Sequence, residues 1–256
     1  MIELPGTEKF VLWRYLTFGR FVWLLRRRAL WLSRGDLLGD NWEGAFSTQQ
    51  LSMLFDSSLA DVGPAAKFAT RGDALLSLTA FAASFPRCFY ANCWTRRVEE
   101  SHAMWRMYCP TNEGVAISTT MGALRQSLPE HIEVLPVGYN LGEEGVMPWL
   151  AMASQKRPMF AEDLEMRVLW FDERELHTSS TNPVGKAVEW DVANIQQIRI
   201  HPQADDSLVD AIADVVNAFA PTLGSIVNRS VMAPGPVSQV IPLIERVRDQ
   251  TPPPKG

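Results

Sequence analysis

The sequence has few cysteines and no excess of basic residues, and each shortage excludes a class of protein. It contains three cysteines, Cys88, Cys93 and Cys109. Their odd number and irregular spacing exclude a disulfide framework and a paired zinc motif, and they indicate a reducing compartment. We therefore expect a cytoplasmic protein. The formal net charge of −5 argues against general electrostatic binding to nucleic acid.

The sequence also lacks a long uninterrupted apolar run. The region from Phe10 to Trp31 is rich in apolar residues, but Arg14, Arg20 and the arginines at 26–28 interrupt it. A transmembrane helix needs about 20 consecutive, mostly apolar residues, so we expect no membrane span. Arg14 also breaks the clean apolar region that a signal peptide requires.

Several motifs of well-known enzyme classes are missing. The sequence has no glycine-rich phosphate loop, no HExxH and no GxSxG. Its four histidines, at positions 102, 131, 177 and 201, are scattered, and we expect each to be structural or exposed. These residues predict no metal site.

What the sequence does contain is enough apolar material for a sizeable core, with hydrophobic residues making up 46% of the chain. Residue patterns predict strands at 10–15, 30–33, 88–94, 114–118, 131–139, 165–171, 187–192 and 195–200. They predict helices at 19–29, 47–59, 74–84, 99–109, 124–128 and 207–219. Because strands and helices alternate without a βαβ rhythm, we expect an α+β fold with a mixed or mostly antiparallel sheet. We expect a single domain over 1–250 and a flexible proline-rich tail over 251–256.

Polar and aromatic residues concentrate first in the segment around Ser101. Spacings of four and three place Ser101, Trp105 and Tyr108 on one face of the predicted helix. A hydroxyl, an indole and a phenol on an exposed face suit the binding of a planar ligand. The alternative is an ordinary helix whose aromatic residues face the core.

A second concentration lies between Lys156 and Arg167. Glu165 should open a strand, with Glu162 just before it. A carboxylate at the mouth of a strand can bind a sugar hydroxyl, hold a metal or act as a base. The alternative is a solvated charge cluster on a turn.

A third candidate is the segment Trp13-Arg14-Tyr15, which places an arginine inside a hydrophobic strand. An unpaired buried charge is costly, so Arg14 must be paired or lie at a site, where it could clamp a phosphate. The alternative is a structural pair with Asp40 or Glu43. These two acids and Asp36 could together bind a divalent cation, although a turn with capping acids fits their spacing better.

Seven short motifs occur in a characteristic order. They are Leu12-Trp13-Arg14-Tyr15, Leu30 to Arg34, Asp40 to Glu43, Cys93-Trp94-Thr95, Glu100 to Tyr108, Gly114 to Ile117, and Lys156 with Glu162 to Arg167. In combination they resemble a widespread bacterial family known only as a domain of unknown function, over roughly residues 10–200. Proteins of this kind resemble those encoded near anti-phage systems, so the resemblance implies a role in defence or as a toxin.

At the level of fold, the order of residues also resembles that of ADP-ribosyltransferases, which have a basic residue or histidine on an early strand, a Ser or Tyr in the middle and a Glu opening a late strand. Here Arg14, Ser101 or Tyr108, and Glu165 occupy these places. The Ser-Thr-Ser strand of that family is absent, and the middle residues fall on a predicted helix. The resemblance implies NAD as cofactor, with Glu165 as the catalytic carboxylate.

In that reading the cofactor would contact several side chains. Arg14 would hold the pyrophosphate, and Trp105 or Tyr108 would stack on the nicotinamide. The wider set of expected cofactor-binding residues is Arg14, Tyr15, Trp105, Lys156, Glu162 and Arg167.

Three functions therefore remain open. The first is an NAD-using enzyme that modifies an unknown macromolecular acceptor. The second is a non-enzymatic sensor or a module that binds a partner in a defence system. The third is a metal-dependent nuclease that uses Asp40, Glu43, Lys156, Glu162 and Glu165.

Overall fold

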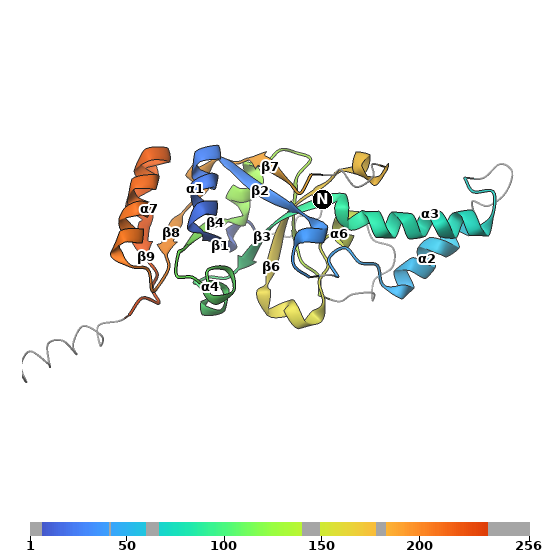
Figure 1. The fold of residues 1–256 in the computed structure, drawn as a ribbon, viewed down its shortest axis with the longest axis horizontal. Coiled ribbons are helices and arrows are strands. Elements are labelled where there is room, and N and C mark those ends of the chain that lie inside the picture. Colours follow the sequence, from blue (N-terminus) through green and yellow to red (C-terminus); the bar gives the residue numbers. More distant parts are fainter. Residues whose placement is uncertain (1–6, 41, 60–66, 140–148, 178–182, 235–256) are drawn as a thin grey trace, which may run out of the picture. The chain divides into compact units, whose positions relative to one another are not determined.

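The chain forms two compact units, each assembled from three segments of sequence. Unit 1 comprises Met1–Arg14, Arg27–Val98 and Thr119–Asn194, and unit 2 comprises Tyr15–Arg26, Glu99–Ser118 and Ile195–Gly256. The computed structural model, shown in Figure 1, describes residues 7–40, 42–59, 67–139, 149–177 and 183–234. The tail expected at 251–256 lies outside these residues.

Strands and helices alternate along the chain. The strands are β1 (Val11–Thr17), β2 (Ala29–Arg34), β3 (Phe89–Arg96), β4 (Gly114–Thr120), β5 (Glu133–Pro136), β6 (Glu165–Phe171), β7 (Gly185–Glu189), β8 (Gln197–Ile200) and β9 (Val227–Arg229). The helices are α1 (Phe18–Arg27), α2 (Thr48–Leu59), α3 (Arg71–Ser84), α4 (His102–Tyr108), α5 (Met121–Gln126), α6 (Trp149–Met152) and α7 (Asp206–Phe219).

Strand β3 organises the sheet of unit 1. It pairs antiparallel with β1, β2 and β6, and the pairing with β6 runs from Phe89 opposite Phe171 to Thr95 opposite Glu165. The outer strands β5 and β7 pair antiparallel with β6 and β2. Because paired residues point to the same face of a sheet, this register decides which side chains of β3 and β6 meet.

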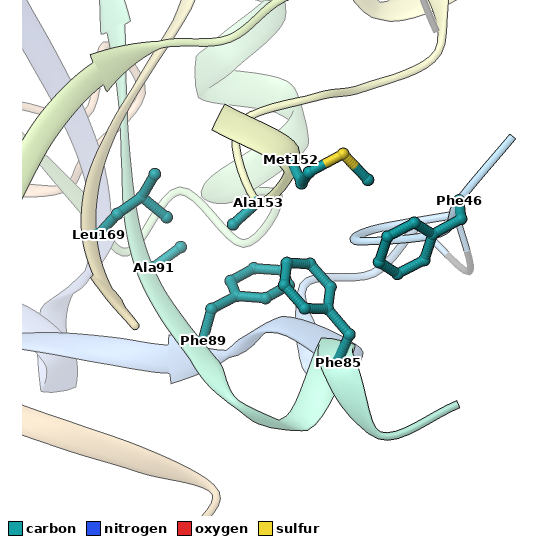
Figure 2. Packing of buried hydrophobic residues seen from close by; sticks show 7 residues of the cluster. All are labelled: Phe46, Phe85, Phe89, Ala91, Met152, Ala153 and Leu169. Atoms are coloured by element: carbon teal, nitrogen blue, oxygen red, sulfur yellow. The ribbon is translucent and has the colours of Figure 1, made fainter. Parts of the chain in front are cut away.

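A hydrophobic cluster covers part of this sheet in unit 1 (Figure 2). Phe89 and Ala91 come from β3, Leu169 from β6, and Met152 and Ala153 from α6 and the residue after it. Phe85 and Phe46 complete the cluster, with the Phe85 ring 5.7 Å from that of Phe89 and 5.2 Å from that of Phe46. Tilted and edge-to-face aromatic pairs such as these add to the stabilisation from burial alone.

Unit 2 contains a smaller, mixed set of strands. β4 pairs antiparallel with β8, and β8 pairs parallel with β9. Helix α1 buries Phe21, Leu24 and Leu25, whose spacing places them on one face of the helix. Helix α7 begins after Asp205, whose carboxylate accepts a hydrogen bond from the Leu208 N–H and so caps the helix.

The predicted fold class is confirmed, because the structure is α+β with a mixed, mostly antiparallel sheet surrounded by helices. Within the described ranges, none of the helices combines the length and apolar character needed to cross a membrane.

Several predicted boundaries are wrong, and hydrogen-bonded caps explain two of them. Helix α3 begins at Arg71 rather than 74, because the Thr70 hydroxyl accepts a hydrogen bond from the Asp73 N–H. Helix α4 begins at His102 rather than 99, because Ser101 is its N-cap. Strand β5 is shorter than predicted, and neither β9 nor α6 was predicted.

Candidate functional site

The residues proposed from sequence are divided between the two units. Unit 1 contains Arg14, Lys156, Glu162, Glu165 and Arg167, and unit 2 contains Tyr15, Ser101, Trp105 and Tyr108.

In unit 1, Arg167 is the centre of a buried ion network made of Glu43, Lys156, Asp163, Glu165 and Arg167, here called the Arg167 network. Arg167 and Glu165 lie two residues apart on β6, so their side chains share one face of the strand. The Arg167 guanidinium donates to Glu165 at 2.7 Å and to Glu43 at 2.9 Å, and it is fully buried. A buried arginine is tolerated because carboxylates neutralise it on two sides.

Lys156 binds the second carboxylate oxygen of Glu165. Its ammonium group lies 3.0 Å from the Glu165 carboxylate and 2.8 Å from that of Asp163. It also lies 4.5 Å from the centre of the Phe160 ring. Both oxygens of Glu165 are thus engaged, one by Arg167 and one by Lys156.

These contacts decide the ionisation of Glu165. Burial favours the neutral acid, but the positive charges of Arg167 and Lys156 prevail and lower the pKa of Glu165 to about 2. Glu165 is therefore a carboxylate at neutral pH. The same contacts raise the pKa of Lys156 in spite of its burial, so this side chain is an ammonium ion.

Arg14 lies next to the same network. Its guanidinium donates a hydrogen bond to the backbone carbonyl of Cys93, the residue opposite Arg167 in the sheet. Burial raises the pKa of the Cys93 thiol, and the charges acting on that thiol come from Glu165, Arg167 and Arg14. Arg14 and Glu165, two of the residues expected to share a site, thus both act on Cys93, whereas Ser101 and Tyr108 belong to unit 2.

The acids considered as partners of Arg14 bind other arginines. Asp40 accepts from Arg157 at 2.8 Å, and Glu43 accepts from Arg167. Asp36 pairs with Arg34 at 2.7 Å. Among the residues that the structure describes, no group of three or more His, Cys, Asp and Glu side chains is arranged to hold a metal ion.

Glu162 does not contribute a carboxylate to the Arg167 network. Its side chain is exposed, and its backbone carbonyl accepts a hydrogen bond from Arg97. The acid that binds Lys156 is Asp163, one residue further along. Sequence spacing located the segment but selected the wrong acid, because a short 3-10 helix (Pro158–Asp163) turns the chain just before β6.

In unit 2, the predicted exposed face of Ser101, Trp105 and Tyr108 is wrong in two respects. Ser101 is the N-cap of α4, and its hydroxyl accepts a hydrogen bond from the Met104 N–H at 3.5 Å. Trp105 is 2% exposed and packs edge-to-face against Tyr15 at 4.9 Å. Only Tyr108, at 44% exposure, matches the prediction.

The indole N–H of the buried Trp105 has a hydrogen-bond partner. It donates to the Glu100 carboxylate at 3.0 Å, and Glu100 also accepts from the Val231 N–H at 3.2 Å and from the Ser230 hydroxyl. Tyr15 is buried as well, and its hydroxyl accepts from the Ser101 N–H at 2.7 Å. The aromatic residues proposed to bind a cofactor therefore belong, in part, to the core of unit 2.

One face of α4 borders a pocket of about 570 Å³ that lies entirely within unit 2 and is here called the α4 pocket. Helix α4 contributes His102, Trp105 and Arg106. The chain after β8 contributes His201 and Gln203, and the chain after β9 contributes Met232 and Pro234. Three segments distant in sequence thus form its walls.

His201 is held firmly in the wall of the α4 pocket. Its ring packs edge-to-face on Trp105 at 5.0 Å, and its Nδ1 accepts a hydrogen bond from the Gln203 N–H at 3.1 Å. Burial lowers the pKa of His201, so the neutral imidazole is favoured. Because Nδ1 accepts, Nε2 carries the hydrogen and is a donor.

Unlike the buried His201, His102 and Arg106 have exposed side chains. They lie four residues apart on α4 and therefore on one face of it. Within the described part of the chain, neither side chain is held by a hydrogen bond or an ion pair. Sequence reasoning missed this pair, although the spacing of four on a predicted helix was a usable signal.

Comparison of the chain with models of protein families, with curated proteins and with solved structures found no match.

Proposed function

We propose that this protein is a non-enzymatic ligand-binding module that receives a small molecule in the α4 pocket. The observation that supports this proposal is a pocket within unit 2 whose wall carries His102 and Arg106, two polar side chains that make no hydrogen bond or ion pair within the described residues. Pockets for small molecules commonly measure about 300–1,000 Å³ and combine apolar walls with a few polar groups. The α4 pocket, at about 570 Å³, falls within this range.

The composition of the walls is also that of a binding site. Met232, Pro234 and the buried Trp105 offer apolar surface, whereas His102 and Arg106 offer charge or hydrogen-bond donors. Apolar contact supplies affinity, and a few placed polar groups supply orientation. On the motif resemblance alone, we place such a module among bacterial defence proteins, where it would act as a sensor.

The Arg167 network supports binding or catalysis less well. Glu165 is 7% exposed and both of its oxygens are held by cations. A substrate would have to displace Lys156 or Arg167 before it could touch this carboxylate. Such closed ion pairs are typical of structural networks.

A screen of small molecules by thermal shift tests the proposal. Ligand binding to the folded state raises the midpoint of thermal unfolding, Tm, by mass action. At least one compound should raise the Tm of the wild-type protein, and Gln203→Trp, which places a large ring on the wall of the pocket, should abolish that shift.

Ala218→Trp is the matched control, because it adds the same ring at an exposed position of α7 that does not line the pocket. It should keep the ligand-induced shift. Failure of every compound to raise Tm, or equal shifts in Gln203→Trp and the wild type, would contradict the proposal.

We also propose a second function, that of an NAD-using, ADP-ribosyltransferase-like enzyme, on one specific observation. Glu165 opens the late strand β6 as an ionised carboxylate. The charges of Glu165 and Arg14 both act on Cys93 of β3. An ionised carboxylate can stabilise an oxocarbenium-like transition state. In this proposal NAD supplies the ADP-ribosyl group, and Glu165 and Arg14 orient it.

The test is release of nicotinamide from NAD, followed by chromatography. Release by the wild type and its loss in Glu165→Gln would support the enzyme. Gln203→Trp serves as the control, since it leaves unit 1 unchanged. Absence of release with every acceptor tried would leave the binding module as the better proposal.

A further inference from the structure

The wall of the α4 pocket carries basic side chains and no acidic ones among the described residues, although the chain as a whole is acidic. Apart from the buried Cys109, its titratable groups are His102, Arg106 and His201, all of which are basic side chains. No aspartate or glutamate is found among the described residues that line the pocket. The chain as a whole carries a net charge of −5. The pocket is therefore a local region of basic character in an acidic protein.

Arg106 also differs from the arginines elsewhere that bind carboxylates. Arg34, Arg157, Arg167 and Arg229 each lie within 3 Å of an aspartate or glutamate oxygen. Arg106, on the wall of the pocket, has no such neighbour among the described residues. A guanidinium beside a pocket and without an internal counter-ion is suited to a carboxylate or phosphate from outside.

His102 and His201 complete a set of donors around the same space. His102 lies one turn of α4 before Arg106. The Nε2–H of His201 is a donor, because Nδ1 already accepts from Gln203. Trp105, Met232 and Pro234 provide apolar surface beside these donors.

We infer that the ligand of the α4 pocket is a small organic anion, whose carboxylate or phosphate group is bound by Arg106 and His102 and whose apolar or aromatic part lies against Trp105 and Met232. This inference rests on the proposed binding function and names its ligand class. Carboxylates and phosphate esters share the chemistry that the wall recognises, and the experiment separates them.

The experiment uses a panel in which every anion has a neutral partner of the same shape. Aromatic carboxylates are paired with their amides, and nucleoside monophosphates are paired with their nucleosides. Dissociation constants are measured by calorimetry on the full chain. We expect the anionic member of at least one series to bind about tenfold or more tightly than its neutral partner.

Single substitutions identify the groups responsible. Arg106→Gln and His102→Gln should each weaken the anion about tenfold while leaving the affinity for the neutral partner unchanged. Arg20→Gln, which removes an exposed arginine of α1 outside the pocket, should leave both affinities unchanged. All three positions are exposed, and unchanged thermal unfolding of the free proteins will show that each variant is folded.

The outcomes separate the two proposals. If neutral compounds bind as tightly as their anionic partners, the inference of an anionic ligand is overturned. If Gln203→Trp also abolishes this binding, the proposed binding function of the pocket stands. Anion binding that Arg106→Gln and His102→Gln leave intact, or that Arg20→Gln weakens equally, would also overturn it. Absence of any binding by the whole panel and by the wider screen would remove the binding function itself.

Discussion

Two glycines next to aromatic side chains illustrate how single residues set the packing of unit 1. A Cβ added at Gly35 would lie 2.3 Å from the Phe89 ring, which is fully buried in the cluster of Figure 2. Gly44 meets the same ring at 2.6 Å and also has a φ of +69°. At Gly35 the constraint is space, and at Gly44 it is both space and backbone conformation.

Substitution of Gly35 by alanine should therefore destabilise the protein. The buried ring cannot move aside without disturbing its neighbours, and overpacking of a core costs about 1–3 kcal/mol. Gly19→Ala in α1 is the matched control, because nothing lies within 4 Å of its added Cβ. It should stabilise the helix by about 0.5–1 kcal/mol. Chemical denaturation checks both; equal effects of the same sign would refute the packing argument.

The ion pairs of Glu165 give a pH dependence of known sign. Its pKa falls from 4.5 to about 2 on folding, so the unfolded chain binds more protons between these values. Stability from this carboxylate is complete above pH 4.5 and is lost as the pH falls towards 2.

Glu165→Gln should consequently be less stable than the wild type at neutral pH, and the difference in free energy of unfolding should shrink as the pH falls below 4.5. Denaturation curves at several pH values measure this difference. Glu162→Gln, at an exposed acid nearby, should show no comparable difference. A gap for Glu165→Gln that stayed constant down to pH 2 would contradict the assigned ion pairs.

At this scale the sequence predicted types of residue better than their partners. Lys156, Glu165 and Arg167 were selected from charges clustered beside a strand, and they do lie in contact. Their further partners, Glu43 and Asp163, depend on how a distant loop and a short 3-10 helix fold back onto β6. That information is not local, so residue spacing could not supply it.

At the scale of elements, capping side chains define where helices begin. Asp205 accepts from the Leu208 N–H at 2.9 Å and satisfies a donor that α7 would otherwise leave free. Ser101 and Thr120 cap α4 and α5 in the same way. Each cap replaces a missing hydrogen bond of the first turn.

Removal of the cap of α7 should lower stability measurably. Asp205→Ala should lower the free energy of unfolding, because it leaves the Leu208 N–H without its acceptor. Asp210→Ala, on the exposed face within the same helix, removes the same charge without touching the cap. It should be neutral or slightly stabilising, because alanine is the best helix former. Similar losses in both variants would point to charge rather than capping.

Elements with a strong local pattern were predicted and the others were not. β6 was predicted with its correct bounds, and α7 to within one residue. β9 has only three residues, and it pairs parallel with β8. Because the paired residues lie about 30 positions apart, no local pattern in the sequence indicates this pairing.

At the scale of the whole molecule, the pocket and the ion network belong to different units. The walls of the α4 pocket come from α4, from the chain after β8 and from the chain after β9. No periodicity connects these segments, so the sequence could indicate Trp105 but not the space beside it. Each unit is likewise assembled from three separate segments, an arrangement that no local sequence pattern indicates.

This division makes stability and binding separable by mutation. Glu165→Gln removes a partner of the buried Arg167 and of the partly buried Lys156 in unit 1, so it should lower Tm at neutral pH. It leaves every residue of the α4 pocket in place, so the rise in Tm caused by a saturating ligand should be retained. Gln203→Trp alters an exposed residue of unit 2, so it should change the Tm of the free protein little and abolish the rise with ligand.

Thermal unfolding of the four proteins, namely the wild type, each single variant and the double variant, measures both quantities in one experiment. The double variant should have the lowered Tm of the first change and the absent ligand shift of the second. If Glu165→Gln alone abolished the ligand shift while the protein remained folded, the ligand would depend on the Arg167 network. The site of binding would then have to be assigned to unit 1, where the NAD proposal places it.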